Sequence, residues 1–248
     1  MCQVDIYGGA RVVDRLDELK NLIDSIKVDK VGFVNLNAHK NTAVSKTAIE
    51  LLPDAKSVIV LANELFPEVV QYLTSGRKMG ELVMRDLFTR NADIVNGDLD
   101  WEAYKLVKGL HKLGYSGIPL TAGDAPFDTR FLEGMLSYKS SAVLAGMGVI
   151  GWNTMLLTPE FGARVRLSCV VTDASLEKTS SSEDYLPCFD CKGACVKVCP
   201  VQALKQPGEG EVCSIDKYLC NTYLASSGGC AECLRVCPAD KLYKNKKS

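Results

Sequence analysis

The sequence predicts an α+β protein in two parts, a layered core at residues 1–176 and a small cysteine-rich module at residues 185–248. Three observations support this division. Helical and strand-like patterns alternate through the first part of the chain. Residues 177–184, E-K-T-S-S-S-E-D, are polar and lack apolar periodicity, which predicts a linker. Nine of the eleven cysteines then lie between Cys188 and Cys237.

The elements of the predicted core follow from local residue patterns. The run S-V-I-V-L-A at residues 57–62 is continuously apolar, which predicts a strand buried on both faces. Residues 137–145 fit either a helix or a strand. The patterns predict helices at 11–27, 43–51, 68–90 (with a weak point at Ser75-Gly76) and 101–113, and strands at 30–36, 57–62, 116–121, 154–157 and 165–172.

Length and charge limit the classes of function. The 248 residues suffice for one substantial core plus an appendage. Lys and Arg total 29 against 30 Asp and Glu, so the balance carries no electrostatic signature of nucleic-acid or membrane binding. The N-terminus lacks a secretory or twin-arginine pattern, and no apolar run approaches the ~20 residues of a membrane helix. We therefore expect a cytoplasmic protein with no nucleic-acid partner and no membrane association.

The cysteines form two motifs that each end in Cys-Pro. The first reads C-F-D-C-K-G-A-C-V-K-V-C-P from Cys188, and the second reads C-A-E-C-L-R-V-C-P from Cys230. In a reducing compartment such a group indicates metal binding rather than disulfides. Thiolates are the ligands of iron–sulfur clusters, and in two-cluster ferredoxins the Cys before Pro binds the other cluster. The motifs therefore predict a bacterial ferredoxin-like module with two [4Fe-4S] clusters.

This crossed pattern predicts the two ligand sets. One cluster takes Cys188, Cys191, Cys195 and Cys237, and the other takes Cys199, Cys220, Cys230 and Cys233. Three residues separate Cys191 from Cys195, where the usual run has two, and Gly193 offers a position to absorb the extra residue. Two alternatives stay open: paired C-x-x-C units also bind zinc, and Cys213 is either a spare thiol or a substitute for Cys220.

A glycine-rich loop precedes the module. Gly146, Gly148 and Gly151 satisfy G-x-G-x-x-G, which suggests a dinucleotide site. A dinucleotide loop opens a helix, however, and here W-N-T-M-L-L-T-P follows, which is typical of a strand and turn. Close approach of the backbone to another flat cofactor, or simple close packing, is favoured. The three glycines, with Trp152 and Asn153, are the candidate cofactor-binding residues.

The chain resembles a known family in three stretches. Residues 142–167, A-V-L-A-G-M-G-V-I-G-W-N-T-M-L-L-T-P-E-F-G-A-R-V-R-L, resemble a signature shared by epoxyqueuosine reductases and corrinoid-dependent reductive dehalogenases. L-L-P-D-A-K-S-V-I-V-L-A upstream and Y-L-C-N-T-Y-L downstream extend the resemblance to epoxyqueuosine reductases. The resemblance implies a core similar to flavin nitroreductases and B12-processing proteins, followed by a two-cluster ferredoxin domain. It also implies a base-off cobalamin between the core and the nearer cluster.

The resemblance has departures that bear on the substrate. The chain lacks the C-terminal helical repeats of epoxyqueuosine reductases and the twin-arginine signal of reductive dehalogenases, so it resembles a short form. We expect a small-molecule or corrinoid-protein substrate and a low-potential electron donor such as a ferredoxin or flavodoxin. A proton donor upstream of the glycine loop is also implied. Tyr138 with Lys139 is the first choice, and Asp128 and Asp124 are the other candidates, with Lys139 and Arg130 as charge partners.

Three functions fit these features. The first is an oxidoreductase that passes electrons through two [4Fe-4S] clusters to a base-off cobalamin. The second is a non-catalytic ferredoxin-type electron carrier or reductive activator of a partner protein. The third is a reductase with a flavin on the same core. A cavity wide enough for a corrin beside the nearer cluster argues against the second function.

Overall fold

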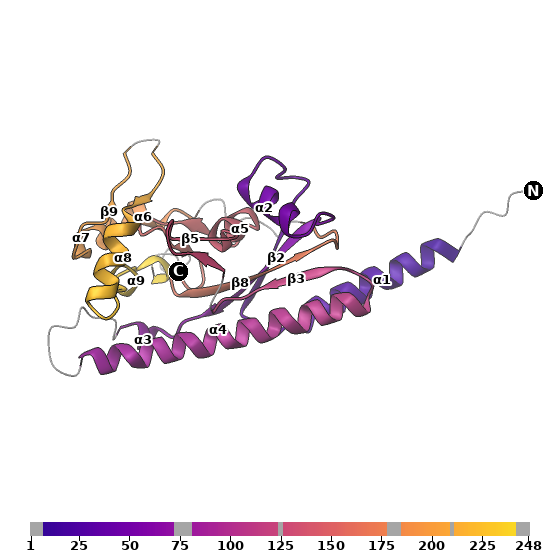
Figure 1. Ribbon diagram of the computed structural model, residues 1–248, viewed down its shortest axis with the longest axis horizontal. Helices are drawn as coiled ribbons and strands as arrows, with labels where there is room; N and C mark the ends of the chain where they lie inside the picture. Colours follow the sequence, from indigo (N-terminus) through magenta and orange to yellow (C-terminus); the bar gives the residue numbers. More distant parts are fainter. Residues whose placement is uncertain (1–6, 72–80, 124–125, 178–184, 209–210, 242–248) are drawn as a thin grey trace, which may run out of the picture.

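A computed structural model describes residues 7–71, 81–123, 126–177, 185–208 and 211–241. The core is a four-stranded antiparallel sheet with strand order β1-β2-β8-β3 (Figure 1). Its strands are β1 (Lys30–Asn35), β2 (Ser57–Glu64), β8 (Val165–Thr172) and β3 (Gly117–Leu120). All four were predicted within a few residues, and the mixed helix and strand content confirms the α+β class.

Helices cover both faces of this sheet. Helices α1 (Tyr7–Asp24) and α4 (Glu81–Lys112) pack on one face, and α2 (Ala43–Leu51) and α5 (Tyr138–Leu144) pack on the other. Strand β2 shows the consequence, because Ile59 and Leu61 belong to the cluster with α4 while Val58 and Val60 belong to the cluster with α2 and α5. The strand is therefore buried on both faces, as its apolar run predicts.

One long helix replaces two predicted ones. The helices predicted at 68–90 and 101–113 correspond to a four-residue helix α3 (Pro67–Val70) and to α4, which runs for 32 residues from Glu81. The expected weak point at Ser75-Gly76 lies outside the described residues. Asn96 does not interrupt α4, because its side chain is buried and accepts a hydrogen bond from Arg166 Nε at 2.8 Å. Packing against the sheet thus overrides a weak local preference for helix.

Shorter elements build the region of interest. Residues 154–157 were predicted as a strand, and only Leu156–Leu157 (β7) pair, with Val149–Ile150 (β6). A second small hairpin joins β4 (Phe127–Asp128) to β5 (Glu133–Gly134). The cysteine-rich part contains α6 (Pro187–Cys191), α7 (Ala194–Val198), β9 (Leu204–Lys205), β10 (Ser214–Ile215), α8 (Lys217–Ser226) and α9 (Glu232–Arg235).

The cysteine-rich part shares a hydrophobic cluster with the core. Leu157 and Ala163 from the core pack with Tyr185, Leu234 and Ala239. The predicted linker falls almost wholly outside the described residues, so the domain boundary stays a prediction. Among the described helices, none is long and apolar enough to cross a bilayer.

A buried ion pair also joins the two parts. The Arg164 guanidinium lies 2.8 Å from Glu64 Oε1, at the end of β2, and 3.0 Å from Asp240 Oδ2, three residues after Cys237. The side chains of Arg164 and Asp240 are both nearly excluded from solvent. The segment that carries the last cysteine is therefore tied to the sheet by a buried charge pair.

Candidate functional site

The structure brings together the four cysteines predicted for the first cluster. Cys237 is largely buried, and the thiols of Cys188, Cys195 and Cys191 lie near it. Burial first, and these neighbouring thiols second, raise the pKa of Cys237 to about 12. Burial, together with the thiols of Cys191, Cys195 and Cys213, raises the pKa of Cys188 to about 11, although the amide of Trp152 partly opposes this rise.

The four cysteines predicted for the second cluster also lie together. Burial, followed by Cys230, Cys195, Cys220 and Cys199, raises the pKa of Cys233 to about 12. Cys195 is the member of the first set in this group, so the two sets adjoin. With these raised pKa values, Cys237 and Cys233 keep their protons at neutral pH, and binding of a metal is what would remove them.

The extra residue between Cys191 and Cys195 has a visible structural solution. Lys192 (φ 51°) and Gly193 (φ 70°) both adopt the left-handed conformation between α6 and α7. A Cβ at Gly193 would lie 3.1 Å from the Trp152 ring, so glycine suits this position. After this turn, the Cys195 thiol lies near those of Cys191 and Cys188.

Cys213 lies beside the first set. It influences the pKa values of Cys188 and Cys195, whereas the thiols near Cys220 are Cys230 and Cys199. This placement makes Cys213 a neighbour of the first set rather than a substitute for Cys220. The described residues contain no group of His, Cys, Asp or Glu arranged to hold a single metal ion. Ligands of a four-iron cluster each bind a different iron atom and do not converge on one point.

Backbone amides point at two of the sulfurs. The Trp152 N–H donates to Cys188 Sγ at 3.4 Å, and the Ala203 N–H donates to Cys199 Sγ at 3.2 Å. Such bonds favour thiolate over thiol, and hydrogen bonds to cluster sulfurs raise the reduction potential. The thiol sets therefore fit a negatively charged iron–sulfur cofactor.

A cavity of about 910 Å³ is lined by residues of both the core and the cysteine-rich part. Its size is near the upper end of the range for ligand pockets, about 300–1,000 Å³. The β4–β5 hairpin, the start of α5 and strand β8 form its core side, and Cys230, Ala231 and Leu234 form the opposite wall. A thiol of the second set thus lines the cavity directly.

The cavity is mainly apolar and carries a few polar groups. The Tyr138 hydroxyl donates to the Thr121 carbonyl at 2.9 Å, and Lys139 Nζ donates to the Thr154 carbonyl at 2.7 Å. Burial raises the pKa of Tyr138 and lowers the pKa of Lys139, although part of the lysine side chain reaches solvent. Arg166, whose pKa burial also lowers, adds a second cation to the wall.

Asp128 lies elsewhere. Its carboxylate accepts a hydrogen bond from Arg130 Nη2 at 2.7 Å, and this guanidinium lowers the pKa of Asp128. The described lining of the cavity contains Phe127 but not Asp128. Asp124 lies outside the described residues. Of the sequence candidates for a proton donor, Tyr138 and Lys139 are the two that the structure brings to the cavity.

The glycine loop packs against protein. None of the candidates Gly146, Gly148, Gly151, Trp152 and Asn153 is among the described residues of the cavity wall. A Cβ at Gly148 would lie 2.1 Å from the Leu157 carbonyl oxygen, which is a backbone clash. Glycine is required here by close packing, which is the plainer of the two expectations from the sequence. The loop instead places Trp152 beside Cys188 of the first thiol set.

Sequence reasoning missed most of the cavity wall. Arg166 lies in the motif A-R-V-R-L but has no spacing signal of its own. Met135 and Leu234 come from segments far apart in the chain. Their convergence depends on the β4–β5 hairpin meeting α9, which no local pattern predicts.

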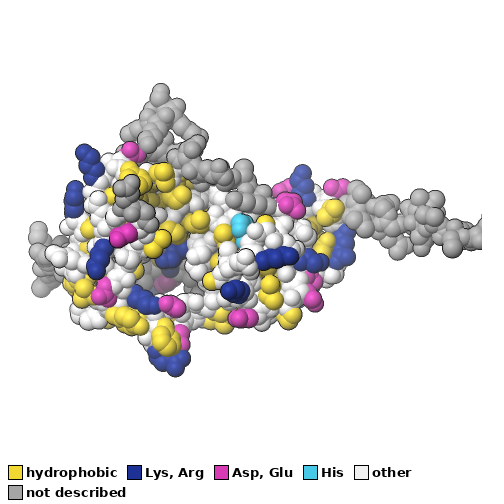
Figure 2. Space-filling view, turned by 90° about the horizontal axis from the view of Figure 1, so that it is seen from above, with side chains coloured by type: hydrophobic (Ala, Val, Ile, Leu, Met, Phe, Trp, Pro, Cys, Tyr) yellow, Lys and Arg dark blue, Asp and Glu magenta, His cyan; other side chains and the backbone are white. Residues whose placement is uncertain are grey.

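A second, open pocket of about 690 Å³ lies beside the first thiol set. Cys188, Trp152 and Phe189 line it, and the Phe189 and Trp152 rings meet edge to face at 5.9 Å. In Figure 2, hydrophobic side chains gather in the left half of the face that is shown, toward the cysteine-rich end of the molecule. The first set therefore reaches an apolar surface, while the second set reaches the cavity.

Comparison with known proteins confirms the family resemblance. No family model matches the chain. Over 206 residues it is 30% identical to a tetrachloroethene reductive dehalogenase of Dehalobacter restrictus, covering 75% of this chain and 33% of that protein. Over 250 residues it is 26% identical to an epoxyqueuosine reductase of Bacillus subtilis, covering 94% of this chain and 59% of that protein. The chain thus spans about a third to three fifths of these relatives.

Solved structures agree on the fold. A reductive dehalogenase structure described in terms of B12-dependent dehalogenation superimposes with a TM-score of 0.67 at 16% identity, over 92% of this chain and 33% of that one. An epoxyqueuosine reductase bound to a modified tRNA-Tyr stem loop gives a TM-score of 0.58 at 22% identity, over 93% of this chain and 66% of that one. The class is therefore the reductase fold common to both groups. In sequence, the chain is similar over most of its own length to a reductive dehalogenase and to an epoxyqueuosine reductase.

Proposed function

We propose that the chain is an iron–sulfur oxidoreductase that carries two [4Fe-4S] clusters and a base-off cobalamin, and that it reduces a small-molecule or corrinoid substrate. The observation that carries this proposal is the cavity between core and cysteines, with Cys230 in its wall. A simple electron carrier has no need of a large cavity at one end of its cluster chain. This feature favours a reductase over the non-catalytic carrier.

The cavity also suits the cofactor. Its core side is apolar, with Leu120, Leu156 and Leu167, which fits the face of a flat macrocycle. No histidine is among the described residues of the wall, and base-off binding without a protein ligand requires none. When bound, the cobalamin supplies the low-potential metal centre at which the substrate is reduced.

The chain's own residues supply the proton. Reductive cleavage of a bond to carbon requires a proton at the reacting carbon. Lys139 has a lowered pKa, so it loses its proton more readily than an ordinary lysine. Its neighbour Tyr138 keeps its proton to higher pH, and the hydrogen bond to the Thr121 carbonyl orients the Tyr138 hydroxyl. We assign Lys139 as the proton donor, with Tyr138 as the hydroxyl that positions the substrate.

The thiol sets define a direction for electron flow. The first set adjoins the open pocket with Phe189, the sets meet where Cys195 approaches Cys233, and Cys230 of the second set faces the cavity. Electrons therefore enter at the first set and leave at the second. A reduced ferredoxin or flavodoxin would dock over the pocket.

The absorption spectrum of anaerobically purified protein tests the proposal. We expect the broad absorption of iron–sulfur clusters, and a corrin spectrum after reconstitution with cobalamin and gel filtration. A flavin spectrum would favour the third function, and retention of neither cofactor beside intact clusters would favour the carrier. A panel of organohalides and epoxides, suggested by the names of the relatives, then identifies the substrate class.

A further inference from the structure

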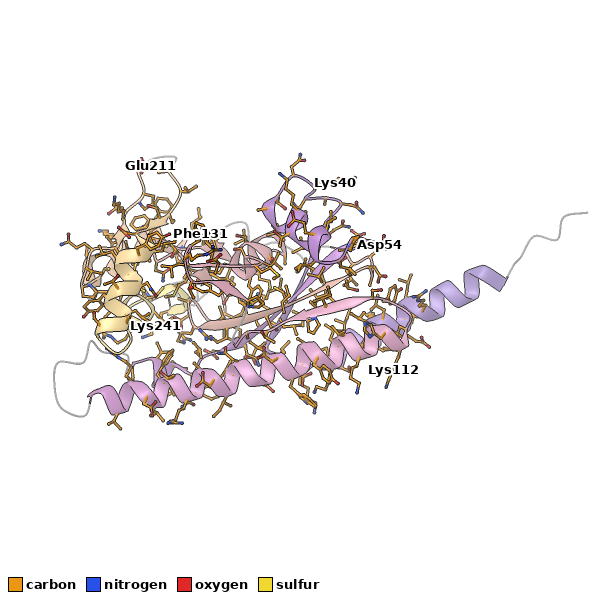
Figure 3. The ribbon with its side chains drawn as sticks, in the orientation of Figure 1. Lys40, Asp54, Lys112, Phe131, Glu211 and Lys241 are labelled. Carbon is orange, nitrogen blue, oxygen red and sulfur yellow. The ribbon has the colours of Figure 1, made fainter. Side chains whose placement is uncertain are left out.

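The outer face of α4 carries a line of exposed apolar side chains. The helix lies along the lower edge of the molecule in Figure 1, with the sheet on one side and no described element on the other. Figure 3 shows side chains projecting from this free side, with Lys112 labelled near the C-terminal end of the helix. The exposed apolar residues are Val83 (72% exposed), Leu87 (44%), Ile94 (71%), Trp101 (59%) and Tyr104 (45%).

The spacing of these residues is that of a helix-pairing seam. The positions 83, 87, 94, 101 and 104 fall in steps of three, four and seven, and Arg90 and Gly97 fill the remaining places of the repeat. A 3.5-residue repeat is the pattern by which one helix packs along another. The buried side of α4 uses other residues, including Leu99 and Leu106. The helix therefore has two apolar faces, and the sheet covers one.

The seam is shaped to receive side chains. A Cβ placed on Gly97 would meet nothing within 4 Å, so the middle of the line is open. The Trp101 and Tyr104 rings stack at 5.5 Å between centroids and present a broad apolar surface. Beside them, α4 and α1 enclose a groove of about 550 Å³ that includes Leu22 and Lys108.

Charges along this face suggest what covers it. The N-terminal half carries exposed Asp86 and Asp93 with Arg90, and the C-terminal half carries exposed Lys108 and Lys112. The Asp98 carboxylate instead accepts a hydrogen bond from Asn63 Nδ2 of β2 at 2.8 Å. Glu102 is buried and pairs with Lys105, so it does not offset the lysines. One half of the face is net negative and the other is net positive. Two such helices attract when antiparallel and repel when parallel.

We infer that a second copy of this chain docks on the outer face of α4, with the two α4 helices antiparallel across a two-fold axis. An antiparallel pair places each acidic half against the basic half of the partner copy, and a two-fold interface uses the same face twice. At 1.5 Å per residue, the part of α4 from Val83 to Tyr104 provides about 32 Å of seam. The inference does not depend on the proposed reductase activity.

Sedimentation velocity of the holoprotein from about 1 to 100 μM tests the pairing. We expect the wild-type chain to be a dimer, and the variant Ile94→Glu/Trp101→Glu to be a monomer with an unchanged cluster spectrum. The matched control Ile49→Glu changes an exposed apolar residue on α2 and should remain a dimer. A monomeric wild type over this range, or a dimer that survives Ile94→Glu/Trp101→Glu, would overturn the inference.

Charge exchange tests the orientation. Asp86→Lys/Asp93→Lys makes both halves positive and should produce a monomer. Adding Lys108→Glu/Lys112→Glu to the same chain reverses both halves, so an antiparallel dimer should return while a parallel one would not. If the fourfold variant is monomeric while the wild type is a dimer, the antiparallel arrangement is wrong.

Discussion

The two thiol sets are held in the molecule in different ways. The first set is built into the core: the Trp152 amide donates to Cys188, the Trp152 ring packs on Gly193, and the buried Arg164–Asp240 pair lies just beyond Cys237. Cys220 of the second set lies on α8, which has no buried residues and contacts the β4–β5 hairpin through an exposed Lys217–Glu133 ion pair.

This difference suits the proposed roles of the two sets. The first set receives electrons at an exposed surface, so a rigid position protects its geometry. The second set faces the cavity, where residues of the β4–β5 hairpin line the wall together with Cys230. Loosely held elements are where motion on binding is expected. Four predictions test the contrast, from the largest expected effect to the smallest.

Removal of one ligand from each set should abolish one cluster each time. We expect Cys237→Ser and Cys220→Ser to lower the iron content from about eight to about four per chain. Cys237→Ser should also lower the thermal stability more, because its site is part of the core. Iron analysis and anaerobic thermal unfolding measure both effects. The control Cys213→Ser should retain about eight iron; loss of a cluster there would mean that the ligand sets are wrong.

Removal of the proposed proton donor should slow the reduction of substrate in the cavity beside the second set. Lys139→Met should lower the rate of substrate reduction by about 10²–10⁴-fold, as expected for loss of a general acid. The pKa of Lys139 is lowered, so this side chain loses its proton at a pH below the ordinary lysine pKa of about 10.4. As pH rises, the wild-type rate should therefore begin to fall before that pH is reached.

The matched variants identify the group responsible. Lys139→Arg should move the fall in rate to higher pH, since arginine keeps its proton. Lys46→Met, at an exposed position on α2, should leave both the rate and its pH profile unchanged. An identical pH profile in wild type and Lys139→Arg would remove Lys139 from the proton-donor role.

The ion pairs that anchor the two thiol sets should contribute differently to the free energy of unfolding. Arg164→Met leaves the Asp240 carboxylate buried without its cation, which costs about 3 kcal/mol. For a chain of this size the melting temperature should fall by about 6–12 °C. Lys217→Met breaks the exposed pair and should cost no more than about 1 kcal/mol. Thermal scans at one fixed rate compare them, and equal shifts would contradict the contrast.

The smallest effect concerns the docking of the electron donor. Phe189→Ala trims an exposed ring beside the first set and should raise the donor KM about fivefold, equivalent to about 1 kcal/mol. Reduction by dithionite should be unchanged, which separates docking from cluster damage. Ile49→Ala, an exposed apolar residue on α2, serves as the control. If Phe189→Ala slows dithionite as much as the protein donor, its role lies in the cluster itself.

Much of the sheet could be predicted from the sequence because its signals are local. The apolar runs of β2 and β8 predict strands without help from distant residues. The strand at 30–36 was likewise predicted from its own residues alone. Helix α4 shows the limit. Residues 91–100 contain Asn96 and Gly97, which are weak helix formers, and contacts such as Asn96–Arg166 that stabilise the helix come from strand β8.

The site shows the same division. The grouping of the cysteines follows from motif spacing, because each loop confines its own thiols. The function of the glycine loop could not be deduced, since the same residues serve either a flat cofactor or the close approach of Leu157. The cavity depends on Cys230, Tyr138 and Arg166 arriving from three separate segments. Only the folded chain shows that they meet.

The Arg164–Asp240 pair has a consequence for biosynthesis. Cys237 follows all four ligands of the second set in the chain, and the salt bridge that anchors its segment joins a residue before β8 to one beyond the last cysteine. A ribosome must therefore release both complete motifs before the proposed first cluster can form. Until then the Arg164 cation near the sheet lacks one of its two carboxylates. For the proposed two-cluster protein, insertion of iron at the first set is thus expected late in maturation, together with docking of the segment that carries Cys237.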